Sequence, residues 1–130
     1  MKKIKTKFQD LKIFKGKKFY DKRGFVEEVF SQNKVKKKLI FSIVSKSNKN
    51  VLRGLHIQTN KTQDKFITVL KGRILDVVVD LRKNSKTFGK HYKILLSEKN
   101  CKFLFVPKGF AHGFLSLEKE NIVLYSSCIK

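Results

Sequence analysis

Short apolar segments separated by polar residues recur along almost the whole chain, and they constrain its fold more than any other feature. They are rich in Val, Ile, Leu and Phe, and they lie at residues 11–14, 25–30, 39–45, 51–57, 66–70, 73–81, 91–96, 103–106, 110–117 and 122–126. Short runs of this composition, bounded by Gly, Asn, Lys or Asp, are typical of β-strands. Residues 35–38 are the one expected helical turn, and the chain has a single Pro. The pattern predicts an all-β fold, with a jelly-roll or related barrel as the best architecture.

The segment Arg73–Leu81 shows the clearest alternation in the chain. Successive side chains of a strand point to opposite faces, so Ile74, Asp76, Val78 and Asp80 should share one face. The Lys-Gly pair just before the segment is suited to a tight hairpin, because Gly accepts a positive φ. Two carboxylates are therefore expected on the same face as two core residues.

Size and composition limit the number of domains and the cellular location. The chain has 130 residues, of which 41% are hydrophobic and 12 are Phe. Such a chain can bury one core but is short for two ordinary domains, so we expect a single domain over residues 1–130. No apolar run is long enough for a signal peptide or a membrane span, which favours a cytoplasmic protein without a membrane partner. Cys101 and Cys128 have no metal-ligand or disulfide spacing, so both are expected to be reduced thiols.

The formal net charge of +21 has two readings. Of the 31 basic residues 27 are Lys, because only Arg23, Arg53, Arg73 and Arg82 are Arg. Recognition of phosphates and guanines favours the Arg fork, so the first reading is a Lys-rich surface. The second is attraction of an anionic partner such as a phosphorylated small molecule. Because no recognised nucleic-acid motif is present, nucleic-acid binding is not expected.

Two imidazoles and an ammonium group are the candidate chemical groups. His56 lies on the segment 51–58, where Leu52, Gly54, His56 and Gln58 should share one face and Arg53 should lie on the other. Lys65 begins the next expected strand. A lone His on a strand is often structural, but a His and a Lys that converge inside a barrel suit proton removal next to a carbonyl group. These residues predict an active site inside the barrel.

The motif Pro107–His112 matches the PxGxxH pattern that ends the metal site of cupins. Metal-binding cupins supply two further His as HxH and a Glu several residues later. In this chain Gln58 stands in place of the second His, and Lys65 stands in place of the Glu. An ammonium group repels a divalent cation, whereas metal sites are built from carboxylate, imidazole or thiolate ligands. The sequence predicts a cupin-type barrel without a metal or another cofactor.

Larger parts of the chain resemble one family, the dTDP-4-dehydrorhamnose 3,5-epimerases. The resemblance covers roughly residues 8 to 126 and rests on Asp21–Glu28, Val51–Gln58, Lys65, Ile74–Arg82, Ser85–Gly89, Pro107–Phe114 and Val123–Tyr125. It implies a metal-free cupin dimer that inverts carbons next to the ketone of a nucleotide-diphospho-4-keto-6-deoxy sugar. It also implies roles for single residues: His56 as base, Tyr125 as acid, Lys65 as the cation at the ketone oxygen, His112 as a hydrogen-bonding group, and Arg23, Glu28 and Arg53 as substrate contacts.

The same resemblance implies that subunits exchange N-terminal strands, so that Arg23 and Glu28 complete the neighbour's site. Two other functions stay open. A sugar-nucleotide 3,4-ketoisomerase is also a small cupin, although an HxH pair is expected where this chain has His56-Ile57-Gln58. A non-catalytic sugar-nucleotide-binding cupin would keep the fold without the chemistry.

The chain departs from the family pattern at two places. The pattern continues beyond the position of Tyr125 into a segment with an aromatic residue for the nucleotide base and an acid for the catalytic His, whereas the printed sequence ends at Lys130. Asp76 is a further candidate carboxylate for His56 or His112, and a buried structural Asp is the alternative. Phe41 and Ile43 stand where the family has Gln and Asn, which predicts a different nucleotide or sugar because apolar groups form no hydrogen bonds.

Overall fold

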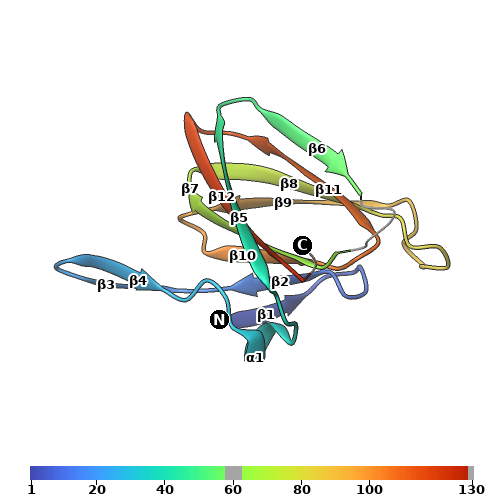
Figure 1. Ribbon diagram of the computed structural model, residues 1–130, viewed down its shortest axis with the longest axis horizontal. Helices are drawn as coiled ribbons and strands as arrows, with labels where there is room; N and C mark the ends of the chain where they lie inside the picture. Colours follow the sequence, from blue (N-terminus) through green and yellow to red (C-terminus); the bar gives the residue numbers. More distant parts are fainter. Residues whose placement is uncertain (58–62, 129–130) are drawn as a thin grey trace.

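The computed structural model describes residues 1–57 and 63–128, and strands dominate this part of the chain (Figure 1). The strands are β1 (Lys2–Lys5), β2 (Lys12–Lys15), β3 (Lys18–Asp21), β4 (Gly24–Glu27), β5 (Phe41–Asn48), β6 (Leu52–His56), β7 (Lys65–Lys71), β8 (Arg73–Asp80), β9 (His91–Ser97), β10 (Lys102–Val106), β11 (Phe110–Ser116) and β12 (Glu120–Ser127). One short helix, α1, spans Gln32–Val35. The predicted all-β class is confirmed.

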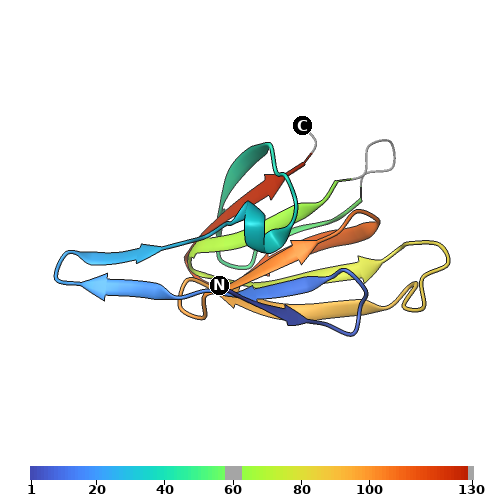
Figure 2. The same ribbon diagram turned by 90° about the horizontal axis from the view of Figure 1, so that it is seen from below.

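The strands form two large antiparallel sheets and a separate hairpin. The six-stranded sheet has the order β1-β2-β10-β7-β12-β5, and the four-stranded sheet has the order β6-β11-β8-β9. Strands distant in sequence are neighbours in both sheets, as in a jelly roll. The β3–β4 hairpin extends away from the two sheets as a long arm, which Figures 1 and 2 both show.

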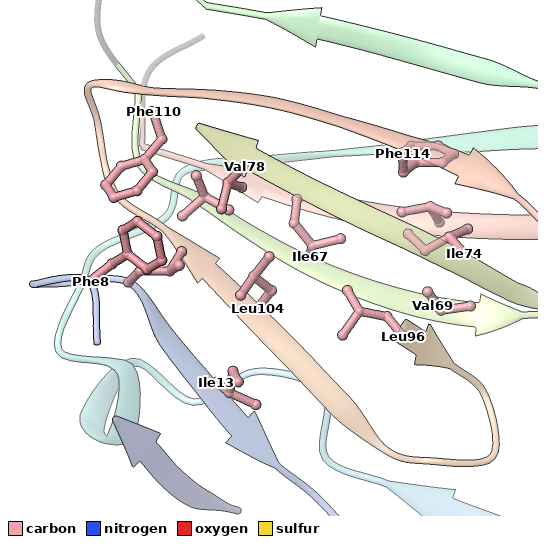
Figure 3. Packing of buried hydrophobic residues seen from close by; sticks show 13 residues of the cluster. Phe8, Ile13, Ile67, Val69, Ile74, Val78, Leu96, Leu104, Phe110 and Phe114 are labelled. Atoms are coloured by element: carbon pink, nitrogen blue, oxygen red, sulfur yellow. The ribbon is translucent and has the colours of Figure 1, made fainter. Parts of the chain in front are cut away.

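The main core lies between the two large sheets. Figure 3 shows Ile67, Val69 and Leu104 of the six-stranded sheet beside Ile74 and Phe114 of the four-stranded sheet. The strand β8 alternates between exposed or half-buried and fully buried residues, as the sequence predicts, because its even-numbered side chains point into this core. Burial of apolar area between the sheets holds them together at about 25 cal/mol per Å².

A second cluster covers the outer face of the six-stranded sheet. The buried residue Val35 of α1 belongs to it, together with Phe14, Phe66, Phe103 and Phe105. The Phe66 ring lies 5.8 Å from Phe14 and 5.9 Å from Phe103 between centroids, which are ordinary distances for aromatic pairs. This cluster anchors α1 and the chain that leads into β5, the edge strand of the sheet.

Three local predictions were incomplete or wrong. The sequence pattern did not indicate β1 or β3, because each has only four residues and β1 is mostly Lys. The expected helical turn at 35–38 begins earlier, at Gln32, and ends at Val35, because Lys36 adopts a left-handed conformation with φ of 65°. The expected strand over 25–30 ends at Glu27. The Lys-Gly hairpin between β7 and β8 is present as predicted, with Gly72 at φ of 83°.

Candidate active site

A pocket of about 290 Å³ lies between the two large sheets and collects most of the predicted site residues. It is lined by Phe41, Ile43, Arg53, His56, Gln63, Lys65, His112, Gly113, Phe114, Tyr125 and Ser127. A larger hollow of about 760 Å³ lies at the other end of β7, among turn residues that mix Lys and Glu. None of the predicted site residues lines that hollow, so the smaller pocket is the candidate active site.

The six-stranded sheet supplies Lys65 and Tyr125 from adjacent strands. Ser127 of β12 pairs with Lys65 of β7 on one side and with Phe41 of β5 on the other. Tyr125 lies two residues away on β12, so its side chain points to the same face of the sheet, and it pairs with Ile43. The ammonium group and the phenol therefore enter the pocket from the same wall.

The four-stranded sheet supplies the two imidazoles, because His112 of β11 pairs directly with His56 of β6. Phe114 pairs with Arg53, so partners two positions apart on β11 are three apart on β6. This extra residue is a β-bulge, and it reverses the direction of later side chains on the strand. Arg53 and His56 both line the pocket as a result. The prediction that they lie on opposite faces of a regular strand was wrong.

Gly54 is the residue that makes this bulge possible. Its φ of 97° is rarely adopted by other residues. A Cβ atom built on Gly54 would lie 2.6 Å from the backbone oxygen of His112, which is closer than such contacts occur. The backbone of β6 can approach β11 only with Gly at this position, so Gly54 determines where His56 and Arg53 lie.

Asp76 pairs with His112 rather than with His56. The carboxylate atom Oδ2 lies 2.8 Å from Nε2 of His112, and Asp76 is fully buried. Its other oxygen, Oδ1, is buried without a hydrogen-bond partner in the described part of the chain. Burial raises the pKa of Asp76, whereas the charges of His112 and Lys65 act in the opposite direction. A hydrogen bond from Nε2 to Asp76 leaves Nδ1 of His112 as an acceptor.

The second buried carboxylate of β8 has a structural role instead. Asp80 accepts hydrogen bonds from the guanidinium and backbone N–H of Arg82 and from the hydroxyls of Ser85 and Thr87. Burial alone would raise the pKa of Asp80, but these hydrogen bonds hold it well below its usual range. Both oxygens of Asp80 are satisfied by the loop that follows β8, so of these two β8 carboxylates Asp76 is the one that contacts a pocket residue, His112.

Lys65 is the partly desolvated cation of the site. Burial lowers the pKa of Lys65, and the negative charge of Asp76 opposes that effect. The protonated ammonium group is thereby placed in a medium where its interaction with a developing negative charge is stronger than in water. Lys65 and His56 line the same pocket, as the sequence predicts.

The pocket is open on the side of β6. His56 and Arg53 are both exposed in the single chain, whereas His112 is buried. The guanidinium of Arg53 donates hydrogen bonds to Oγ of Ser47 and to the backbone oxygen of Lys46, which direct it along the rim. In the single chain, the β6 side of the pocket is thus open to solvent, whereas the side formed by His112 of β11 is closed.

Two predicted substrate contacts lie away from this pocket. Arg23, at the tip of the β3–β4 arm, is 90% exposed in its side chain and pairs with Asp21 at 2.6 Å. Glu28 follows the arm and pairs with Lys34 at 2.9 Å. Neither residue lines the pocket of its own chain.

The expected lack of a metal stays a prediction. In residues 1–57 and 63–128, no group of three or more His, Cys, Asp or Glu side chains is close enough to hold a metal ion. Gln58, which the sequence places in the position of a cupin ligand, lies outside the described residues. Within these same ranges no helix has the length and hydropathy needed to cross a bilayer.

Sequence reasoning did not identify Phe114 and Ser127 as pocket residues. Ser127 is two residues beyond Tyr125 and could have been found from strand alternation alone. Phe114 required knowledge of the sheet order, because it reaches the pocket beside the bulged strand β6.

The fold and the pocket define the class of protein: a jelly roll of the cupin type with a pocket between its two sheets. The family model for dTDP-4-dehydrorhamnose 3,5-epimerase matches residues 5–128. The chain belongs to this family, which confirms the family predicted from the sequence.

Curated relatives carry the same family name. The chain is 42% identical over 127 residues to the dTDP-4-dehydrorhamnose 3,5-epimerase of Methanothermobacter thermautotrophicus, which covers 94% of this chain and 69% of the relative. It is 44% identical over 121 residues to the Escherichia coli enzyme of that name, covering 88% of this chain and 65% of the relative. The chain therefore spans about two thirds of the length of these two relatives.

Solved structures have the same fold. The epimerase of Legionella pneumophila, in complex with dTDP-4-keto-L-rhamnose, superposes with a TM-score of 0.94 at 37% identity, over 99% of this chain and 72% of that one. The Bacillus anthracis enzyme, with TDP and PPi bound, superposes with a TM-score of 0.93 at 40% identity, over 99% of this chain and 78% of that one. The names of these proteins agree with the activity predicted from the sequence.

Proposed function

We propose that this chain is an epimerase of a nucleotide-diphospho-4-keto-6-deoxy sugar, which inverts one or both carbons next to the ketone. The observation that carries the proposal is the pocket itself, in which His56, Lys65, His112 and Tyr125 meet from two sheets. In this proposal they act as a base, a cation, a hydrogen-bonding imidazole and an acid, which are the groups that proton transfer next to a carbonyl group requires.

Each group has a defined part in the reaction. His56 takes the proton from the carbon next to the ketone, and the electrons of the C–H bond form a C=C bond. The π electrons of the ketone move to its oxygen, which becomes an enolate that the Lys65 ammonium stabilises. Tyr125, from the opposite wall, donates a proton to the other face of the same carbon as the C=O bond forms again. The sugar is unchanged except for the configuration of that carbon.

The Asp76–His112 pair supports this chemistry indirectly. Asp76 holds Nε2 of His112, which orients the second imidazole toward the pocket. In this proposal His112 hydrogen-bonds near the reacting part of the sugar and Asp76 is its positioning residue. The buried carboxylate of Asp76 is therefore hydrogen-bonded to His112 and not to the proposed base, His56.

The size of the pocket supports binding of the sugar inside and of the nucleotide outside. Its volume of about 290 Å³ is just below the range of about 300–1,000 Å³ for small-molecule sites. The Arg53 guanidinium at the rim is suited to the diphosphate, since its planar donor array can bind phosphate oxygens in a bidentate way.

The direct test is exchange of solvent deuterium. The chain is incubated in D₂O with a nucleotide-linked 4-keto-6-deoxyhexose, and NMR measures deuterium at C3 and C5. We expect incorporation at one or both positions, because Tyr125 donates a solvent-exchanged proton. Movement of the ketone from C4 to C3 would instead indicate a ketoisomerase. Tight binding by a folded sample with no exchange would indicate the non-catalytic cupin and overturn the epimerase.

The same proposal includes a homodimer in which the arm of one copy completes the pocket of the other. The β3–β4 arm carries exposed apolar residues, with Tyr20 and Val26 each 73% exposed. The rim strands also expose apolar side chains, with Val44 of β5 at 58% and Leu52 of β6 at 71%. Mutual burial of these surfaces would stabilise a symmetric pair. A cytoplasmic location stays a prediction.

A mixture of two inactive variants tests the shared site. In the dimer proposed, Arg23→Ala removes a contact from the partner's pocket and His56→Asn removes the base from its own pocket. Hybrid dimers formed by mixed refolding have one intact site, so about a quarter of the wild-type exchange activity should return if subunits pair at random. Recovery of no activity in a mixture that is dimeric by sedimentation would contradict completion in trans.

A further inference from the structure

One wall of the pocket is apolar, although every predicted reacting group is polar. Phe41 and Ile43 lie on β5, the edge strand of the six-stranded sheet, and both line the pocket. Phe41 pairs with Ser127 of β12, and Ile43 pairs with Tyr125 of β12. Both side chains therefore lie between the proposed acid and the edge of the sheet. The polar groups Lys65 and His112 reach the pocket from other strands. The part of the pocket lined by β5 is therefore apolar, whereas β6, β7, β11 and β12 supply its polar groups.

An apolar wall constrains which part of a bound sugar can contact it. A hydroxyl or phosphate oxygen placed against Phe41 and Ile43 would gain no hydrogen-bond partner from these side chains. An aliphatic group in the same position would be stabilised by burial. The side of the sugar that faces β5 should therefore carry the most apolar substituent of the substrate.

Ile43 also lies beside the proposed acid, because Tyr125 is its direct partner on the neighbouring strand. In the proposed reaction Tyr125 donates a proton to a carbon next to the ketone. When that carbon is C5, its exocyclic substituent is the methyl group of a 6-deoxy sugar. In that orientation this methyl group is the aliphatic substituent expected to face the side chains of β5.

We propose that Phe41 and Ile43 form a subsite for the C6 methyl group and that they select 6-deoxy sugars over sugars with a C6 hydroxyl. The inference rests on the proposed function, and the substrate feature that the site would recognise is the substituent at C6. Ile43 is 49% exposed in the single chain, so the subsite lies at the mouth of the pocket. An apolar subsite discriminates against an added hydroxyl by about 10² at most.

The test compares two substrates that differ only at C6. Deuterium exchange at C5 and binding by titration are measured for a nucleotide-linked 4-keto-6-deoxyhexose and for the same compound with a C6 hydroxyl. We expect kcat/KM of the wild type to be about 10–100-fold higher for the deoxy sugar. Ile43→Asn should lower that preference about tenfold by accepting the hydroxyl. Ile43→Thr, which keeps the branched shape, should lower it less.

Leu95→Asn is the matched control, because Leu95 is an exposed apolar residue of β9 that does not line the pocket. It should leave the preference unchanged. Equal use of both sugars by wild type, or an unchanged preference in folded Ile43→Asn, overturns the methyl subsite while the epimerase stands. If neither sugar exchanges, the epimerase fails and the binding ratio decides: a preference for the deoxy sugar supports the subsite, and equal affinity overturns it.

Discussion

Replacing His56 with Asn should lower the rate of deuterium exchange into the sugar by about 10²–10⁴-fold, the usual contribution of a positioned general base. Asn keeps a polar side chain of similar size but cannot accept the proton. The affinity for the nucleotide sugar should change little, because the Asn amide can still form hydrogen bonds at the rim. Single-turnover exchange and calorimetric titration measure the two quantities separately.

His91→Asn is the control for this substitution, because His91 is an exposed residue of β9 away from the pocket. It should exchange deuterium at the wild-type rate. A loss of less than tenfold in His56→Asn would show that another group removes the proton, and the buried His112 would then be the candidate base.

Replacing Lys65 with Met should lower the same rate by about 10²–10³-fold, comparable to the loss of a donor that stabilises an oxyanion. Met retains the length of the side chain and lacks the charge. The pH profile gives a second readout. Lys65 is charged below its pKa, which burial lowers from the ordinary value, so the wild-type rate should fall as the pH rises into the alkaline range. This alkaline decrease should be absent from Lys65→Met.

Lys71→Met is the matched control at the other end of β7. Its ammonium group pairs with Glu120 on the surface, so the substitution removes a charge of equal sign without touching the pocket. It should leave both the rate and the pH profile unchanged. A similar alkaline decrease in both variants would assign that titration to a group other than Lys65, and a rate near wild type in Lys65→Met would remove the lysine from the reaction.

Much of the fold follows from local pattern. The alternation of β8 predicts that Ile74 and Val78 are buried with Asp76 and Asp80 on the same face, and all four are buried. The Gly72 turn follows from the same reasoning, because a positive φ is needed there. These features depend on the two-residue period of a strand and on backbone sterics, which the order of residues determines without reference to the rest of the chain.

The arrangement of the site depends on contacts between distant strands. The bulge at Gly54 appears only when β6 is paired with β11, and it brings Arg53 to the same side as His56. The choice of Asp76 for His112, and of Asp80 for Arg82, depends on which strand or loop lies beside each carboxylate. The two-residue alternation of β8 does not distinguish Asp76 from Asp80, because it places both on the same face.

The amino-acid order by itself determined an all-β fold in which His56 and Lys65 stand where a metal site would need other ligands. It also contained motifs specific enough to indicate the family. Tertiary structure alone decided that the arm with Arg23 projects away from its own pocket and that Phe41 and Ile43 form an apolar wall beside Tyr125. The physical reason is that side-chain identity sets the chemistry available to a chain, whereas the pairing of distant strands determines which groups share one desolvated space.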